Sequence, residues 1–320
     1  MLSDKQKKHI LVNRDGLKYY TVEGLEKVHE EMLRLLLIID TIAKENNIPY
    51  WIDGGSLIGI VRHKGFIPWD DDLDISLLKK DYLRLIKEIS MYCEMHNDVA
   101  LFYNEPLVEH TCNFFASKKV FSRTQGSCVL VPVKIDIRPV NCIVKNKDNV
   151  IENNIYRDTA NYIIFGKSYG YMKKTLSHKN EQMDFLEYYN YKYGLVDSGL
   201  ENVIMVHPYF EFSNTFELTY NDLFPLKMLQ FENMLLPVPN NYDYLLKELY
   251  GDYMSYPNIC HRAPVACQIY QRQLKDNRFN LCLSMFKHTN RGLLYRMRII
   301  LVQIRSVSYT HLRAHETGAY

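Results

Sequence analysis

Apolar residues recur every three to four positions across residues 22–46, with polar residues between them. This period predicts a long amphipathic helix, with Thr21 as its N-cap. The same period covers residues 80–95, and residues 242–250 predict a short helix that Gly251 stops. Each of these helices is expected to bury its apolar face against a core.

Strand patterns alternate with the helices. Residues 50–52 predict a short strand, and residues 57–61 one or two helical turns. Acidic and apolar residues alternate over 73–77, which is the period of a strand. The middle of the chain is rich in strand formers. Further strands are expected at 99–103, 112–121 and 128–137, and a hairpin at 226–237.

These elements predict an α/β (α+β) fold with a mixed sheet flanked by helices. The core is expected over roughly residues 20–145. Residues 148–193 carry tyrosine-rich helical patterns, so a helical second half is expected to pack on this core. No internal repeat or low-complexity linker divides the chain.

Composition places the chain among soluble globular proteins. It has 320 residues, 47% of them hydrophobic and 24% charged, and 39 basic against 37 acidic side chains give a net charge of +2. These values exclude disordered, collagen-like and disulfide-scaffold classes and argue against a nucleic-acid partner. Seven scattered cysteines without a CxxC pair indicate reduced thiols in the cytoplasm. There is no stretch typical of a signal peptide or a spanning helix.

Three features carry candidate chemistry. Gly54, Gly55 and Ser56 follow a strand, where a turn without Cβ atoms lets backbone amides approach a phosphate. Asp72 and Asp74 share one face of a strand, an arrangement that suits a divalent cation with oxygen ligands. Taken singly, a plain tight turn and a solvated acidic turn are the simpler interpretations.

Asp136 is the third feature. It lies between two isoleucines in an apolar strand, where a carboxylate is costly to bury without a partner. A solvated aspartate on an edge strand is the simpler interpretation of this residue alone. Together, the glycine-serine turn, the DxD pair and the later aspartate form the pattern of the nucleotidyltransferase superfamily.

At finer grain, DGGSLIGIVRHKGFIPWDDDLDISLLKKDY closely resembles the signature of the LicD family of phosphocholine and related phosphotransferases, which includes fukutin-type ribitol-phosphate transferases. FFASKKVFSRT, KIDIRPVN and FENMLLPVPNNYDYLLKELYGDYMSYP resemble later blocks of the family, so the resemblance spans about residues 22–262. Two positions depart from the pattern. Arg138 stands where a phenylalanine is common, and Asp53 precedes the glycines. Neither departure is expected to touch the metal ligands.

The resemblance implies roles for individual residues. Asp72, Asp74 and Asp136 would be catalytic and would bind Mg²⁺ (or Mn²⁺). Asp70 has the same strand parity as Asp72 and is the alternative ligand, but it is expected to lie behind these three. Asp136 as ligand and Asp136 as base remain alternatives. Substrate contacts are expected from the residues that match the phosphate turn, the loop after it and a later strand: Gly54, Gly55, Ser56, Arg62, Lys64, Trp69 and Lys119. For the basic residues the alternative is solvated loop charge, and for Trp69 it is packing.

The implied reaction moves a phosphocholine-type or phospho-alditol group from a CDP-linked donor, such as CDP-choline, to a hydroxyl of a cell-surface or lipid-linked glycan and releases CMP. Lipopolysaccharide and teichoic acid are the glycans considered. The alternatives are nucleotidyl transfer with release of pyrophosphate, and a non-catalytic module that binds glycan or nucleotide. No nucleic acid is expected as a partner.

The expected organisation is an N-terminal extension (1–21), a catalytic domain (22–262), a basic amphipathic region (263–306) and a foreign tail (307–320). The tail contains VSYTHLRAHET, which is similar to a translated sequencing adapter. Residues 281–305 hold five basic and no acidic side chains. This stretch is compatible with peripheral contact at the cytoplasmic face of the membrane, or with a helix docked on the core.

Overall fold

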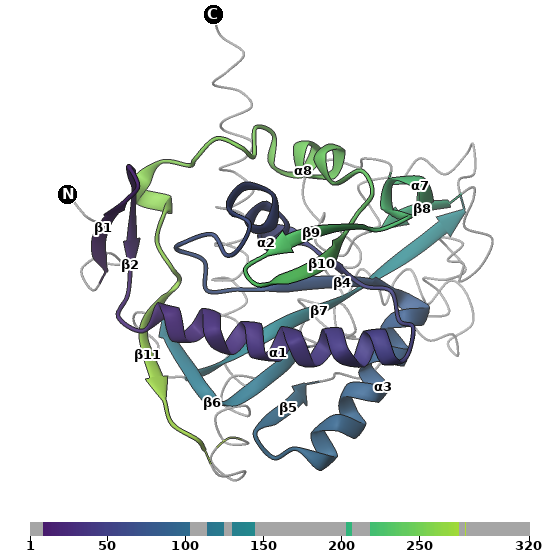
Figure 1. Ribbon diagram of the computed structural model, residues 1–320, viewed down its shortest axis with the longest axis horizontal. Helices are drawn as coiled ribbons and strands as arrows, with labels where there is room; N and C mark the ends of the chain where they lie inside the picture. The colour runs from purple at the N-terminus through teal and green to yellow at the C-terminus, as the bar shows by residue number, and fades with distance from the viewer. Residues whose placement is uncertain are drawn as a thin grey trace, which may run out of the picture.

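The computed structural model describes residues 9–102, 114–124, 130–144, 203–206, 218–274 and 279. A seven-stranded mixed sheet forms its centre (Figure 1), in the order β11-β6-β7-β4-β3, with β5 also paired to β6 and β8 to β7. The strands β4 and β7 run parallel, whereas the other neighbours are antiparallel. The strands are β3 (Trp51–Ile52), β4 (Asp74–Leu78), β5 (Val99–Phe102), β6 (Phe114–Thr124), β7 (Val131–Val144), β8 (Val203–Val206) and β11 (Ala266–Gln271). The mixed α/β fold class is confirmed.

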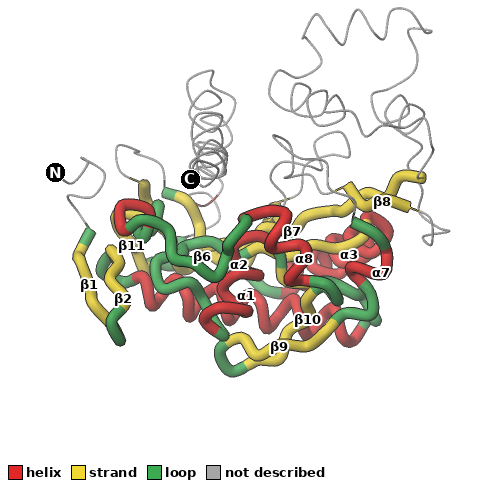
Figure 2. Tube along the Cα trace, turned by 90° about the horizontal axis from the view of Figure 1, so that it is seen from above, coloured by secondary structure: helices red, strands yellow, loops and turns green. Residues whose placement is uncertain are grey.

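Two long helices lie on the sheet. Helix α1 (Leu25–Glu45) contacts β6 and β7, and helix α3 (Lys79–Met95) contacts β4, β5, β7 and α1. The hairpin of β9 (Lys227–Phe231) and β10 (Met234–Val238) lies on the α1 side of the sheet, as the view from above shows (Figure 2). Among the helices of the described ranges, none is both long and apolar enough to cross a bilayer.

Short elements complete the described part. Helix α2 (Gly54–Ile58) continues into a π-helical turn (Gly59–His63). Strands β1 (Ile10–Arg14) and β2 (Leu17–Thr21) form a separate hairpin. The remaining elements are α7 (Tyr220–Leu223), α8 (Tyr242–Tyr250) and a 3-10 turn (Ile259–His261). The chain from α8 runs past α2 toward β2 and then into β11 (Figure 1).

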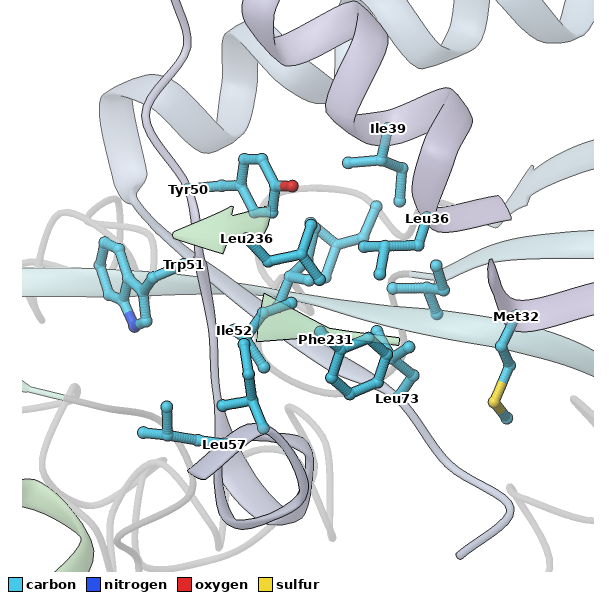
Figure 3. Packing of buried hydrophobic residues seen from close by; sticks show 14 of the residues in the cluster. Met32, Leu36, Ile39, Tyr50, Trp51, Ile52, Leu57, Leu73, Phe231 and Leu236 are labelled. Carbon is cyan, nitrogen blue, oxygen red and sulfur yellow. The ribbon is translucent and has the colours of Figure 1, made fainter. Parts of the chain in front are cut away.

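One core joins the two halves of the chain. Leu36 and Ile39 of α1, Ile52 of β3, and Phe231 and Leu236 of the hairpin are fully buried in the same cluster (Figure 3). The hairpin buries the last residue of β9, Phe231, and the last three residues of β10, Leu236 to Val238. The β9–β10 hairpin is therefore part of the structure that supports the sheet.

Most predicted elements are confirmed, including the hairpin and α8. The N-cap prediction is wrong: α1 begins at Leu25 after Gly24, which adopts a left-handed conformation with φ 85°. Thr21 pairs with Ile10 in the β1–β2 hairpin, so its backbone belongs to a strand. Strand β11 and this hairpin were not predicted, because both are short and their patterns are weak. Residues 148–193 and 281–305, and the tail 307–320, lie outside the described residues.

Two neighbouring leucines of α1 test the core. Leu36 is fully buried, whereas Leu37 is 54% exposed. We expect Leu36→Ala to lower the free energy of unfolding by about 2–5 kcal/mol, because it removes buried apolar surface and leaves a cavity. The matched change Leu37→Ala should cost less than about 0.5 kcal/mol. Urea unfolding monitored by circular dichroism measures both, and equal losses would contradict this assignment of the core.

Candidate active site

Parallel pairing of β4 with β7 brings the predicted aspartates together. Asp74 is in register with Asp136, and the amide of Asp136 donates to the carbonyl of Leu73 at 2.9 Å. Asp72 precedes β4 and points to the same side. One oxygen from each of the three carboxylates lies within 4.8 Å of the other two. In the described part of the chain, this is the one group of acidic, histidine or cysteine side chains arranged to hold a metal ion.

Two basic side chains on β7 accompany these carboxylates. Lys134 and Arg138 lie two residues before and after Asp136, so all three share a face of the strand. The ammonium of Lys134 contacts Asp136 and lies 3.7 Å from Asp72 Oδ1. Arg138 Nη2 lies 2.6 Å from Asp74 Oδ1. The expectation that Arg138 stays clear of the ligands is therefore wrong, because strand parity turns it onto the face of the aspartates.

Burial and nearby charges shift the pKa values of the three carboxyls in different directions. Burial raises the pKa of Asp74 well above its usual range; Arg138 lowers this pKa, while Asp72 and Asp136 raise it. Burial also raises the pKa of Asp136, against the pull of Lys134. Burial opposes ionisation of Asp72 too, but Lys134 and Arg138 outweigh it and lower the pKa. The cluster therefore favours a further positive charge placed among its oxygens.

The glycine-serine turn supports the cluster. Asp53 caps α2 by accepting from the amide of Gly54 at 2.8 Å, and Ser76 donates its hydroxyl to the other oxygen of Asp53. The amide of Asp74 donates to Ser56 Oγ at 3.0 Å. Gly54 has φ +56°, and a Cβ there would lie 2.7 Å from an Asp74 oxygen. Glycine is required at this position because the backbone passes so close to a carboxylate.

The loop that carries Asp70, Asp71 and Asp72 is held at several points. His29 of α1 hydrogen-bonds the carbonyl of Asp70 at 2.7 Å. Asp71 accepts from the amides of Val265 and Ala266, at 3.1 and 2.6 Å. The Asp70 carboxyl lies near the turn, 3.4 Å from the position that a Cβ on Gly55 would take. Asp70 is thus close to the turn, while Asp71 ties the loop to the start of β11.

Glu232, at the tip of the β9–β10 hairpin, holds the first part of the same loop. Its carboxylate accepts from the amide of Phe66 at 3.1 Å, and its own amide donates to the carbonyl of Lys64 at 2.7 Å. Lys64 is exposed and has φ 56°.

Other predicted contact residues lie among protein partners. Arg62 donates to the carbonyls of Tyr253 and Ser255 at 2.8 and 3.2 Å. Trp69 is buried, with its ring centroid 5.8 Å from that of Tyr19, so packing describes its environment. Lys119 lies in the irregular stretch of β6 and forms an ion pair with Asp98 at 2.6 Å.

Sequence reasoning missed Lys134 as part of the site and noticed Arg138 only as a departure from a pattern. The available signal was the spacing of KIDIR, which places Lys134, Asp136 and Arg138 on alternate positions of one strand. Tyr250 was also missed. Burial raises the pKa of its hydroxyl, and so do the carboxyls of Asp53 and Asp74; its helix, α8, contacts α2.

A mixed sheet with three carboxylates across two adjacent parallel strands defines a nucleotidyltransferase-type site. The family model described as LicD/FKTN/FKRP, nucleotidyltransferase domain, matches residues 47–241. The chain belongs to this family.

Individual relatives agree with this membership. The chain is 24% identical over 265 residues to the lipopolysaccharide cholinephosphotransferase LicD of Haemophilus influenzae, covering 72% of this chain and 92% of that protein. It is 47% identical over 34 residues to the human ribitol 5-phosphate transferase FKRP, covering 11% of this chain and 7% of that one. An uncharacterized protein of Rickettsia prowazekii is 29% identical over 104 residues, and the match spans 32% of this chain and 38% of that protein.

His63 beside the site provides a test by pH. Arg62 donates to His63 Nε2 at 3.0 Å, and burial together with this positive charge lowers the histidine pKa to about 4. The folded protein therefore binds fewer protons than the unfolded chain between about pH 4 and 6.5, and stability falls as the pH drops through this window. We expect the unfolding free energy of His63→Gln to fall by about 1–2 kcal/mol less than that of the wild type over this pH window. This value is smaller than the pKa shift alone would give, because His63 is partly exposed and solvent screens its charge.

Chemical unfolding of both proteins at pH 4, 5, 6 and 7.5 measures the effect. The two curves should lie close together at pH 7.5, because His63 is neutral there in both the folded and the unfolded state. Parallel curves across the whole range would show that His63 does not titrate in this way.

Proposed function

We propose that this protein transfers a phosphate-linked substituent, of the phosphocholine or phospho-alditol type, from a CDP-activated donor to a glycan hydroxyl and releases CMP. The observation that carries the proposal is the set of three carboxylates with oxygens within 4.8 Å, placed between two basic side chains of β7. Family membership and the names of the relatives, a cholinephosphotransferase and a ribitol 5-phosphate transferase, support this class of reaction.

A divalent cation fits the donor set. Carboxylate oxygens are hard ligands of the kind that Mg²⁺ and Mn²⁺ take. Ligands at about 2.1 Å from Mg²⁺ are at most about 4.2 Å apart, so the 4.8 Å limit of this cluster requires only small side-chain rotations. We propose that Asp72, Asp74 and Asp136 hold the ion. When bound, it would neutralise charge on the diphosphate of the donor.

The basic residues of the chain would act on the same phosphates. Lys134 and Arg138 now neutralise the aspartates, and a cation among the carboxylates would free their N–H groups for phosphate oxygens. Gly54 keeps the turn close to this position, and Ser56 holds the backbone of Asp74. Lys64 remains a candidate phosphate contact on the exposed loop. Trp69 and Lys119 stay predictions as substrate contacts.

In the proposed reaction a glycan hydroxyl attacks the phosphorus that bears the substituent. The bond from this phosphorus to the bridging oxygen breaks, and that oxygen leaves with CMP. The hydroxyl proton passes to a carboxylate of the cluster. The protein would therefore work mainly by aligning the two substrates and by offsetting charge.

We also propose that the protein works in the cytoplasm, at the inner face of the membrane. The basic and apolar composition of residues 281–305 supports contact with anionic lipid, and a lipid-linked glycan precursor would be available there.

Metal binding is tested by titration with Mn²⁺, followed by electron paramagnetic resonance of the free ion. We expect Asp136→Asn to weaken binding at least about tenfold, because it removes a charged oxygen ligand. Asp15→Asn is the matched control. Asp15 is exposed in the β1–β2 turn at φ 52°, a conformation that asparagine tolerates. Equal Mn²⁺ affinity of the two variants would contradict the proposal that these carboxylates form the metal site.

The reaction is tested with Mg²⁺, a panel of CDP-linked choline, ethanolamine, ribitol and glycerol donors, and an acceptor glycan precursor. We expect CMP from one donor and a loss of at least about 100-fold in Asp74→Asn, since even partners of metal ligands contribute 10–100-fold. Release of pyrophosphate from a nucleoside triphosphate, with no CMP from any donor, would instead favour nucleotidyl transfer. Unchanged turnover in Asp74→Asn would contradict the assigned site.

A further inference from the structure

Two arginines that are 200 positions apart in sequence meet at one tyrosine. The guanidinium carbon of Arg62 lies 4.9 Å from the ring centroid of Tyr256, and that of Arg262 lies 5.2 Å from it. Both distances are typical of cation–π contacts. Tyr256 is 40% exposed, so this group of three residues reaches the surface.

The hydrogen bonds of both arginines go to neutral atoms. Arg62 donates to two backbone carbonyls and to the ring of His63. Arg262 donates to the carbonyls of Pro257 and Lys18, at 2.7 and 3.1 Å. Each guanidinium has five N–H donors. Within the described ranges neither arginine forms an ion pair with a carboxylate, so both retain donors and an uncompensated charge.

Holding two like charges together has a cost. Burial lowers the pKa of Arg62, Tyr256 raises it, and the positive charge of Arg262 lowers it again. The protein nevertheless keeps both side chains in place through the backbone of residues 253–257 and of β2. A bound anion would offset the repulsion and use the remaining donors.

The arginine pair borders the acidic loop. The Tyr256 ring lies 6.3 Å from that of Trp69, the residue before Asp70. Three and four residues after Arg262, the amides of Val265 and Ala266 donate to the carboxylate of Asp71. A ligand held by these arginines would therefore lie next to the loop that positions Asp72.

We propose that Arg62 and Arg262 form a phosphate-binding site beside the aspartate cluster, with Tyr256 keeping the two guanidiniums in place. The ligand is a phosphoryl group, carried either by the donor or by the acceptor. Only the choice between these sources rests on the proposed transfer reaction. The site itself is defined by the two cations and requires no metal.

The test measures binding of inorganic phosphate and of pyrophosphate to the full chain in EDTA, by isothermal titration calorimetry. We expect the wild-type protein to bind both anions. Arg262→Gln should weaken binding about tenfold or more, because it removes charge-assisted hydrogen bonds. Unchanged phosphate affinity in Arg262→Gln would overturn the proposal. The arginines would then only hold the backbone of residues 253–262 in place.

Arg84→Gln is the matched control. Arg84 also donates to two backbone carbonyls, those of Asn46 and Asn47, and in addition pairs with Asp81 at 2.9 Å; its loss removes the same charge elsewhere on the surface. It should leave phosphate affinity within about twofold. If Arg84→Gln lost as much phosphate affinity as Arg262→Gln, the effect would come from the change in net charge, and the proposed site would be wrong.

A second variant guards against misfolding. If Arg262→Gln does not fold, Arg262→Lys keeps the charge but loses the planar fork. It should then weaken phosphate binding several-fold while circular dichroism and the unfolding midpoint stay close to those of the wild type. Full phosphate affinity in this folded variant would also contradict the proposal.

A last arm identifies the source of the phosphate. With Mg²⁺ and a CDP-linked donor present, displacement of bound phosphate assigns the site to the donor, and simultaneous binding assigns it to the acceptor. Either result supports the site. If no donor is turned over, the proposed reaction fails, but the measurement in EDTA still decides on the arginines because it contains neither metal nor donor.

Discussion

The parallel pairing of β4 with β7 is the constraint on which the site depends. This register places Asp74 against Asp136 and turns Asp72 toward both, which brings three carboxylates into a partly buried space. Such an arrangement is repulsive by itself. Lys134 and Arg138 offset the repulsion because strand parity places them on the same face of β7 as Asp136. The strand pair that assembles the anions thus also supplies the cations that stabilise them.

Elements far apart in sequence hold the acidic loop against this strand pair. Helix α1 contacts the loop through His29, the β9–β10 hairpin through Glu232, and the start of β11 through backbone amides bound to Asp71. The hairpin is anchored in turn by Phe231 and Leu236 in the core shared with α1. Burial of apolar surface in the β9–β10 hairpin is therefore coupled to the position of the acidic loop, although no described residue beyond β7 belongs to the carboxylate cluster.

Charge is distributed unevenly around the site, and this suits a substrate with several phosphates. The aspartates lie between Lys134 and Arg138, and a second pair of cations, Arg62 and Arg262, lies at Tyr256 beyond Trp69. The near-neutral total of the chain conceals this local separation. The diphosphate donor that we propose would need a cation at its anionic oxygens, and the fixed basic side chains could position its phosphates around that cation.

The sequence by itself determined the elements whose signals are local. The period of α1 and α3, the strand before the glycines and the β9–β10 hairpin follow from spacing and residue type, whereas the grouping of Asp136 with Asp72 and Asp74 is expected from the family resemblance. The tertiary structure decided which side chains meet. In the structure Thr21 lies in a strand and not at a helix cap, and Lys119 forms an ion pair with Asp98. Arg138 forms an ion pair with Asp74, and Arg262 contacts the same tyrosine ring as Arg62. These contacts depend on strand register and on packing between distant segments, which no local period encodes.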